Sequence, residues 1–184
     1  MARSYLCSFN ELFSLKDEEN SIEINQVTIP IIQRDYAQGR DEVKRIRDRF
    51  LSSLLTAING NGICLDFIYG DIDSKGKLTP LDGQQRLTTL FLLYWYSAKK
   101  NGIEYEKYDF LDRFSYETRY SSRDFCHELI KFNPDFNADL ILSEQIINQS
   151  WFPLDWKNDS TISSMLVMID EISNYFGNVN VSEP

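Results

Sequence analysis

The chain has only one histidine and three cysteines, and these small numbers exclude several classes of site. His127 alone cannot form a zinc site or a histidine-based nuclease centre, because both need partners at suitable spacing. Cys7, Cys64 and Cys126 lie far apart and form no C-x-x-C pair. Because their number is odd and we recognise no secretion signal, we expect reduced thiols in a cytoplasmic protein.

The sequence also lacks a long apolar run and a nucleotide-binding P-loop. Its longest apolar stretch, residues 87–96, contains Thr88 and Thr89. That stretch is well short of the roughly 20 residues that span a bilayer, so we expect no membrane partner. The pattern G-x-x-x-x-G-K-S/T is absent, which excludes an enzyme of the P-loop class.

Cations are scarce as well, since 19 basic residues stand against 28 acidic ones, for a net charge of −9. This balance does not favour broad, non-specific binding of nucleic acid, which depends on many cations. An anion site must therefore be local and built from few arginines. Three arginines have aromatic neighbours in the sequence: Arg113, Arg119 and Arg123. They either form a surface that binds DNA or are ordinary surface cations around a core.

The 184 residues, 42% of them hydrophobic, suffice for one domain with a sizeable core. Hydrophobic periodicity, turn residues and capping residues predict strands mixed with helices first and mainly helices later. This order favours an α+β fold with a mainly helical C-terminal part. The predicted strands are 22–32, 64–69, 77–81 and the first part of 108–120; the predicted helices are a short one within 1–20, then 41–59, 84–100, 122–132, 138–149 and 159–176.

The clearest chemical feature is the sequence Asp82-Gly83-Gln84-Gln85-Arg86, which joins a predicted strand to a very apolar helix. The first turn of a helix has backbone N–H groups without partners and a positive dipole end, so it attracts anions. The glycine allows a ligand close approach, and the arginine offers a planar cation to phosphate oxygens. The alternative is structural, with the aspartate capping the helix and the arginine pairing with a surface acid.

A second segment follows the same logic, because residues 28–32 lead into Gln33, Arg34 and Tyr36 before the helix that we expect to be capped by Asp41. Two such turns side by side would clasp one polyanion. The alternative is that Arg34 and its neighbours are ordinary turn residues.

Together, the two segments resemble the N-terminal domain of GmrSD-type restriction enzymes. The resemblance lies in I-P-x-x-Q-R-x-Y at residues 29–36 and D-G-Q-Q-R-L-T-T-L at residues 82–90, and it extends over about 22–176. Where many members of that family have a tryptophan after the tyrosine, this chain has Ala37-Gln38-Gly39. The His-containing nuclease domain that usually follows in the family is absent from this chain.

The resemblance implies a core related to ParB and sulfiredoxin over residues 22–120, preceded by an arm at 1–21 and followed by a helical extension at 121–184. It also implies binding and hydrolysis of a nucleoside triphosphate, often GTP, that controls a nuclease in a modification-dependent restriction system of phage defence. We therefore expect a nuclease domain or subunit as partner, possible oligomers, and a chain that belongs to a longer protein.

Carried onto this sequence, the resemblance assigns Gln33, Arg34 and Tyr36 to one side of the nucleotide site. It assigns Asp82, Gly83, Gln84, Gln85 and Arg86 to the other side. Chemically, the two arginines would stabilise phosphate charge, Asp82 would hold Mg²⁺, and one of the two glutamines would orient water. The alternatives are a module that binds or senses DNA without hydrolysis, and a scaffold that docks a nuclease domain.

Overall fold

The computed structural model describes residues 4–16, 22–30, 34–60, 62–117 and 120–179. Within them it forms a mixed α/β fold with a four-stranded sheet, in the order β2-β3-β1-β4. The strands are β1 (Gln26–Ile29), β2 (Tyr69–Ile72), β3 (Lys77–Asp82) and β4 (Phe114–Tyr116). The α-helices are α1 (Lys44–Ile58), α2 (Gln84–Lys100), α3 (Tyr120–Lys131), α4 (Leu142–Ile147) and α5 (Ser160–Phe176). The predicted α+β class is thus confirmed.

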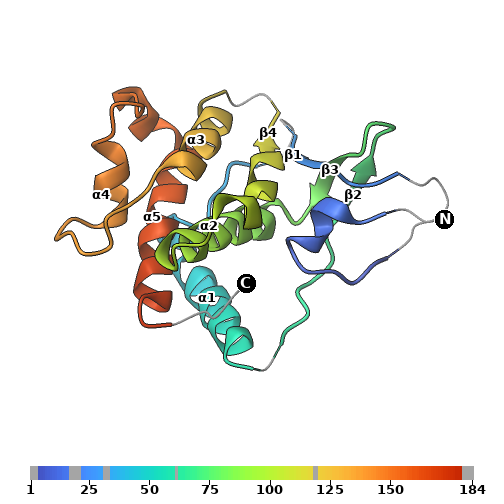
Figure 1. Ribbon diagram of the computed structural model, residues 1–184, viewed down its shortest axis with the longest axis horizontal. Coiled ribbons are helices and arrows are strands. Elements are labelled where there is room, and N and C mark those ends of the chain that lie inside the picture. Colours follow the sequence, from blue (N-terminus) through green and yellow to red (C-terminus); the bar gives the residue numbers. More distant parts are fainter. Residues whose placement is uncertain (1–3, 17–21, 31–33, 61, 118–119, 180–184) are drawn as a thin grey trace.

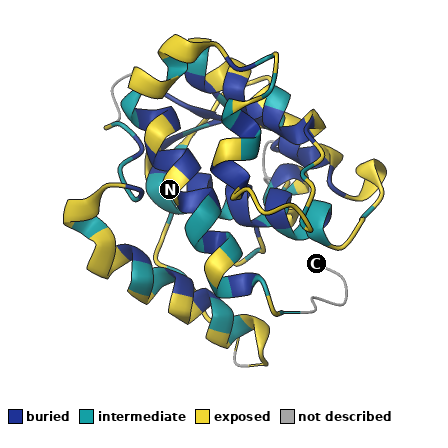
Figure 2. Cartoon of the chain, turned by 90° about the vertical axis from the view of Figure 1, so that its left-hand side faces the viewer, coloured by how far each residue is buried: buried dark blue, intermediate teal, exposed yellow. Residues whose placement is uncertain are grey.

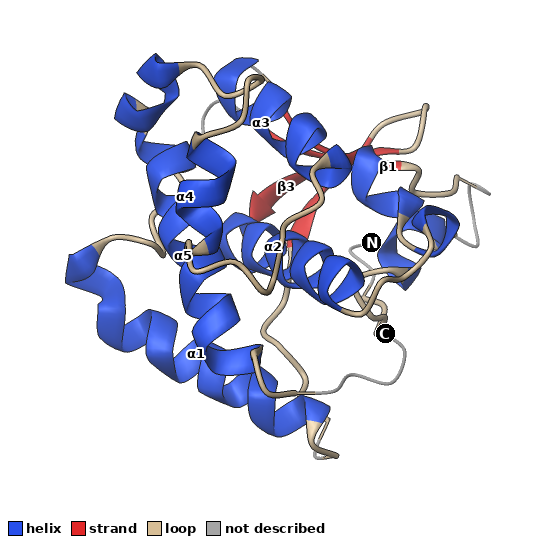
Figure 3. Ribbon diagram, turned by 60° about the vertical axis from the view of Figure 1, so that its left-hand side comes forward, coloured by secondary structure: helices blue, strands red, loops and turns tan. Residues whose placement is uncertain are grey.

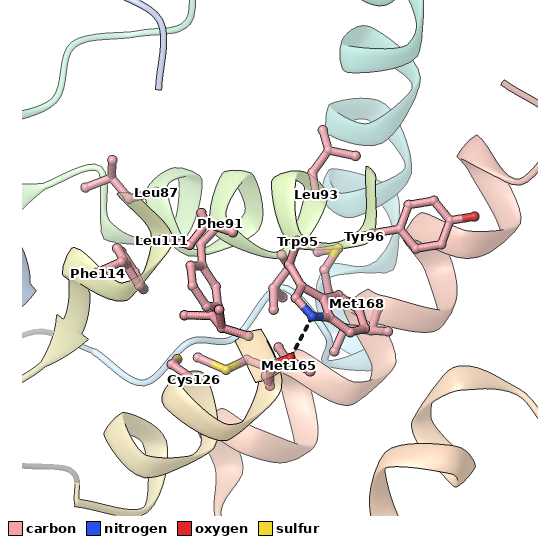
Figure 4. Packing of buried hydrophobic residues seen from close by; sticks show 14 of the residues in the cluster. Leu87, Phe91, Leu93, Trp95, Tyr96, Leu111, Phe114, Cys126, Met165 and Met168 are labelled. Atoms are coloured by element: carbon pink, nitrogen blue, oxygen red, sulfur yellow. Dashed lines mark hydrogen bonds between the residues drawn. The ribbon is translucent and has the colours of Figure 1, made fainter. Parts of the chain in front are cut away.

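Helix α2 runs through the middle of the molecule, with the sheet on one side and α5 and α1 on another (Figures 1 and 3). It has the predicted bounds, 84–100, and its apolar side chains are largely buried. Trp95 is fully buried, and its indole N–H donates a hydrogen bond of 2.7 Å to the carbonyl of Leu129 in α3 (Figure 4). Phe91 stacks on Phe114 of β4, with ring centroids 4.9 Å apart, so α2 joins the sheet to the helical layer.

The C-terminal helix belongs to the same core. Ile162, Met165, Met168, Ile169 and Ile172 of α5 are fully buried and form one hydrophobic cluster with α2 and the sheet. Figure 2 shows the buried positions gathered toward the middle of the molecule. The hydrophobic core thus includes residues on both sides of position 120.

Several predicted elements differ in extent. The predicted strand 64–69 is wrong, because residues 62–68 have no regular structure and the strand is β2. The reason lies in the turn after β2, where the Asp73 carboxylate accepts hydrogen bonds from the backbone N–H groups of Lys75 and Lys77 and sets the register with β3. Two short 3-10 helices, Tyr105–Lys107 and Asp109–Arg113, precede the short β4, so the strand predicted in the first part of 108–120 begins only at Phe114. The predicted helix 138–149 is reduced to α4.

The helix predicted from 41 begins as a 3-10 turn, Asp41–Val43, and Asp41 does not cap it. Its buried face is also rotated from the predicted one. Ile46 is exposed, whereas Arg47 and Leu51 are buried. At the N-terminus, the expected short helix is a 3-10 turn, Glu11–Ser14.

Candidate functional site

The candidate site lies at the edge of the sheet where three parallel strands end. Strand β1 pairs in parallel with β3 on one side and with β4 on the other. Their carboxyl ends therefore face the same way, and each strand leads there into a loop or a helix start. Helix α2 begins directly after β3, and α3 begins shortly after β4. In open α/β sheets this edge is where ligands bind.

The first turn of α5 meets the same edge through two side-chain hydrogen bonds. The hydroxyl of Ser121, in the first turn of α3, donates to the carboxylate of Asp159, which caps α5. The hydroxyl of Ser160 donates to the carboxylate of Asp35, in the loop after β1. The starts of α3 and α5 and the loop after β1 are thus neighbours.

Gln85 fastens the loop of residues 34–40 to the first turn of α2. Its side-chain oxygen accepts a hydrogen bond of 2.9 Å from the backbone N–H of Ala37, and its side-chain NH₂ donates one of 2.9 Å to the carbonyl of Asp35. The two segments that the sequence singled out therefore lie side by side. Because both ends of its amide are engaged, Gln85 holds the loop in place.

Tyr36 lies under the loop, with 2% of its surface exposed. Its hydroxyl is 2.8 Å from Thr89 Oγ1, and that threonine in turn donates to the carbonyl of Gln85 at 2.9 Å. Burial raises the pKa of Tyr36 well above its usual value, so the phenol stays neutral. Its ring anchors the loop to the core and offers no open face to a ligand.

Arg47, which the sequence did not single out, braces the far end of this loop from α1. Its Nη1 donates to the carbonyls of Gln38 and Arg40 at 2.9 and 3.3 Å, and its Nη2 lies 3.3 Å from a carboxylate oxygen of Glu171 in α5. The side chain is 2% exposed. One sequence signal could have identified Arg47. It precedes Leu51 by four residues, about one helical turn, and therefore lies on the same buried face of α1.

Gly39 packs the same loop against α5. A Cβ atom at this position would lie 2.1 Å from the backbone carbonyl oxygen of Ser164, a distance that no side chain tolerates. Only glycine allows the two backbones to approach so closely.

Arg86 is held on the other side of the α2 start. Its Nη2 donates to the carbonyl of Phe67 at 2.8 Å and lies 3.3 Å from the carboxylate of Asp82. Its Nη1 is buried and makes no hydrogen bond with any described residue; the nearest acid is Asp66, at 3.8 Å. Arg86 thus has fixed neighbours, yet one of its nitrogens is left for a further acceptor.

The first turn of α2 keeps its own donors open. Gly83 occupies the N-cap position in the left-handed region, at φ +91°, and no side chain caps the helix. Asp82 therefore pairs with Arg86 and does not cap α2. Within the described ranges, no acceptor meets the backbone N–H groups of Gln84, Gln85 and Arg86. Open donors at the start of a helix attract anions in general.

Two further polar side chains among the predicted site residues have no partner among the described residues. The amide of Gln84 makes no hydrogen bond with the described residues, and Arg34 is exposed with no ion pair among them. Arg34 stands next to the clamped residues 35–37. The convergence of its guanidinium group with that of Arg86 stays a prediction, and Gln33 lies outside the described residues.

The described acids at this edge do not form a cluster of metal ligands. Among the described residues, no group of three or more His, Cys, Asp or Glu side chains is placed to hold a metal ion. The carboxylate of Asp82 is 58% exposed beside the start of α2. One carboxylate suits Mg²⁺ when phosphate oxygens complete the coordination, because this ion usually binds through one or two carboxylates plus phosphates.

Two pockets are formed by other residues. One, of about 120 Å³, is apolar and opens between the C-terminal ends of α1, α2 and α5. The other, of about 260 Å³, lies between β4 and α3 and includes His127, whose nearest carboxylate is Asp112 at 3.9 Å. Neither is lined by the residues predicted to bind nucleotide.

The arginines considered for DNA are engaged within the fold. Arg113 donates to the carbonyl of Phe13 at 2.8 Å and lies over its ring, and Arg123 pairs with Asp124 at 3.0 Å. Arg119 lies outside the described residues. These contacts match the structural alternative for Arg113 and Arg123.

Comparison with known proteins identifies a family. Residues 9–183 match the model of the GmrSD restriction endonuclease N-terminal domain. No curated protein and no solved structure matches the chain. Within the described ranges, no helix is both long and apolar enough to cross a membrane. The match spans nearly the whole chain and includes both segments of the candidate site, and the chain belongs to the family of GmrSD restriction endonuclease N-terminal domains.

Proposed function

We propose that this chain binds the phosphates of a nucleoside triphosphate at the start of α2, and that binding and hydrolysis of this ligand regulate a nuclease of a restriction system. The observation that carries the proposal is the uncapped first turn of α2, where three backbone N–H groups meet no acceptor among the described residues. The buried Nη1 of Arg86 makes no hydrogen bond there either, and its ion-pair neighbour Asp66 lies 3.8 Å away. Buried donors without partners cost free energy that an anionic ligand would recover.

The surrounding charges support a local anion site in a negative molecule. The helix dipole of α2, which spans 17 residues, adds positive potential at its start. Arg34 is exposed and directly precedes residues 35–37, whose backbone Gln85 holds against that start. The proposal directs its guanidinium group toward the phosphates. A rigid loop loses little entropy when the ligand binds.

Hydrolysis would follow from the same arrangement. Water attacks the γ-phosphorus, the bond between this atom and the bridging oxygen breaks, and the products are the diphosphate and inorganic phosphate. The amide of Gln84, which is largely buried and makes no hydrogen bond with the described residues, would orient the water, whereas that of Gln85 holds the loop. Mg²⁺ held by Asp82 and the phosphate oxygens would neutralise developing charge.

The nuclease itself is proposed to lie in another domain or subunit, because His127 is the single histidine of the sequence and its one ion-pair neighbour among the described residues is Asp112, at 3.9 Å. The relation of the core to the ParB and sulfiredoxin folds remains part of the same proposal, supported by the family membership.

Calorimetric titration of the chain with ATP, GTP, CTP, UTP and inorganic tripolyphosphate, with and without Mg²⁺, tests the proposal. Arg34→Ala should weaken triphosphate binding about ten-fold, since a hydrogen bond to a charged group contributes about 1.5–3 kcal/mol. It should leave the melting temperature unchanged because Arg34 is exposed. Arg49→Ala, which removes an exposed arginine of α1, is the matched control and should bind normally.

Phosphate release from the bound triphosphate measures hydrolysis. Failure of the wild-type chain to bind tripolyphosphate and all four nucleotides would contradict the proposal. Unfolding of Arg34→Ala would instead favour the scaffold, in which the arginines serve structure alone.

A further inference from the structure

Two exposed aromatic residues, Phe67 and Tyr69, belong to a segment whose backbone contacts the start of α2. Phe67 is 79% exposed and Tyr69 is 60% exposed, although both carry large apolar rings. An isolated exposed apolar residue is common on protein surfaces. Here two aromatic residues stand two positions apart, next to the site proposed for the phosphates.

The contacts of residues 67–69 place this segment beside the residues predicted to bind the phosphates. The carbonyl of Phe67 accepts the hydrogen bond from Arg86 Nη2. A Cβ atom on Gly83 would lie 2.6 Å from a side-chain carbon of Ile68, so Ile68 faces the N-cap of α2. Tyr69 pairs in register with Asp82, at the end of β3. The backbone of residues 67–69 is therefore fixed against residues 82–86.

The segment 67–69 combines a backbone that is held in place with aromatic rings that are exposed. Ile68 fills the space beside Gly83, and the rings before and after it stay in water. An aromatic ring at this place offers a flat apolar face to a planar ligand group, and a nucleobase stacks on such a face whatever its identity.

We propose that Phe67, with Tyr69 beside it, forms a platform that stacks the base of the nucleoside triphosphate. The inference rests on the proposed function, because the start of α2 must hold the phosphates for the base to reach this platform. Stacking reads the face of the base and not its edge, so the platform accepts all four nucleotides, and purines bind more tightly because their ring area is larger.

The test compares nucleotides with inorganic tripolyphosphate, which carries the phosphates but no base. Phe67→Ala should weaken the binding of ATP, GTP, CTP and UTP about ten-fold, in the range that stacking contributes per base. The affinity of the Phe67→Ala variant for tripolyphosphate should equal that of the wild type. Phe67→Trp should restore nucleotide binding, and Leu140→Ala, an exposed apolar residue between α3 and α4, is the control expected to behave as wild type.

The outcomes separate the two proposals. If nucleotides bind and Phe67→Ala changes nothing, or weakens tripolyphosphate equally, the platform is refuted while the phosphate site stands. If the wild-type chain binds tripolyphosphate as tightly as any nucleotide, the base makes no contact and the platform is refuted as well. If it binds neither, both proposals fail together.

Discussion

Two segments flank the first turn of α2, and they are held in different ways. The loop 34–40 is fastened from three helices: Gln85 bonds its backbone, Tyr36 is buried under it, and Arg47 and Gly39 join it to α1 and α5. The segment 66–69 is held mainly by its backbone, through Arg86 and the packing of Ile68, and its aromatic rings are exposed.

The start of α2 thus contacts both a segment with one conformation and a segment whose exposed side chains can change conformation. A loop whose polar backbone groups are satisfied by buried side chains has one conformation, because each alternative leaves a buried donor or acceptor without a partner. Exposed rings on a fixed backbone can still change rotamer, which suits contact with ligands of different shape.

The largest effect should come from removing the buried brace. Arg47→Ala leaves Glu171 and two backbone carbonyls without their donor, so we expect a loss of about 3 kcal/mol in the free energy of unfolding. Urea denaturation measures it, with Arg45→Ala, an exposed neighbour on α1, as control. Equal stability of the two variants would mean that the loop is not clamped through α1.

A smaller effect is expected from Tyr36, which is buried under the loop 34–40. Tyr36→Phe removes the hydroxyl bonded to Thr89, which should cost about 1 kcal/mol at neutral pH. Because burial raises the folded-state pKa of Tyr36, its stabilising effect is complete below the unfolded-state value of about 10 and declines as the pH rises above it.

Denaturation of both proteins across this range measures the dependence on pH. The stability difference between wild type and Tyr36→Phe should be constant near neutral pH and should shrink above about pH 10. A difference that grew with pH would mean that the phenolate, and not the phenol, is the form that the fold stabilises.

The smallest effect is expected on the open side. Asp66→Asn removes a fully exposed carboxylate 3.8 Å from Arg86, and surface ion pairs of this kind contribute little. The unfolding midpoint should not move, at low or at high salt. A clear loss of stability would show that side chains also clamp the segment 66–69, and the contrast between the two segments would disappear.

Local sequence predicted the elements whose signals are strong and short in range. The bounds of α2 follow from its apolar residues together with the Asp82-Gly83 start and the Asn101-Gly102 end, and Asp159 caps α5 as its position suggests. The prediction that 64–69 forms a strand failed for a tertiary reason. Those residues are apolar enough for a strand, but the hairpin register places β2 at 69–72 and leaves them beside α2.

The candidate site likewise has features that the local sequence predicted and features that only the tertiary structure decided. Sequence patterns alone placed two polar turns at the ends of strands, because glycine, arginine and a following apolar helix carry that information locally. Only the tertiary structure decided which of these side chains are buried, which hold the loop and which are exposed. It buries Tyr36, engages Gln85 with the loop, brings in Arg47 from α1, and exposes Phe67. Such contacts depend on strand order and on the approach of segments far apart in the chain, and no local pattern encodes them.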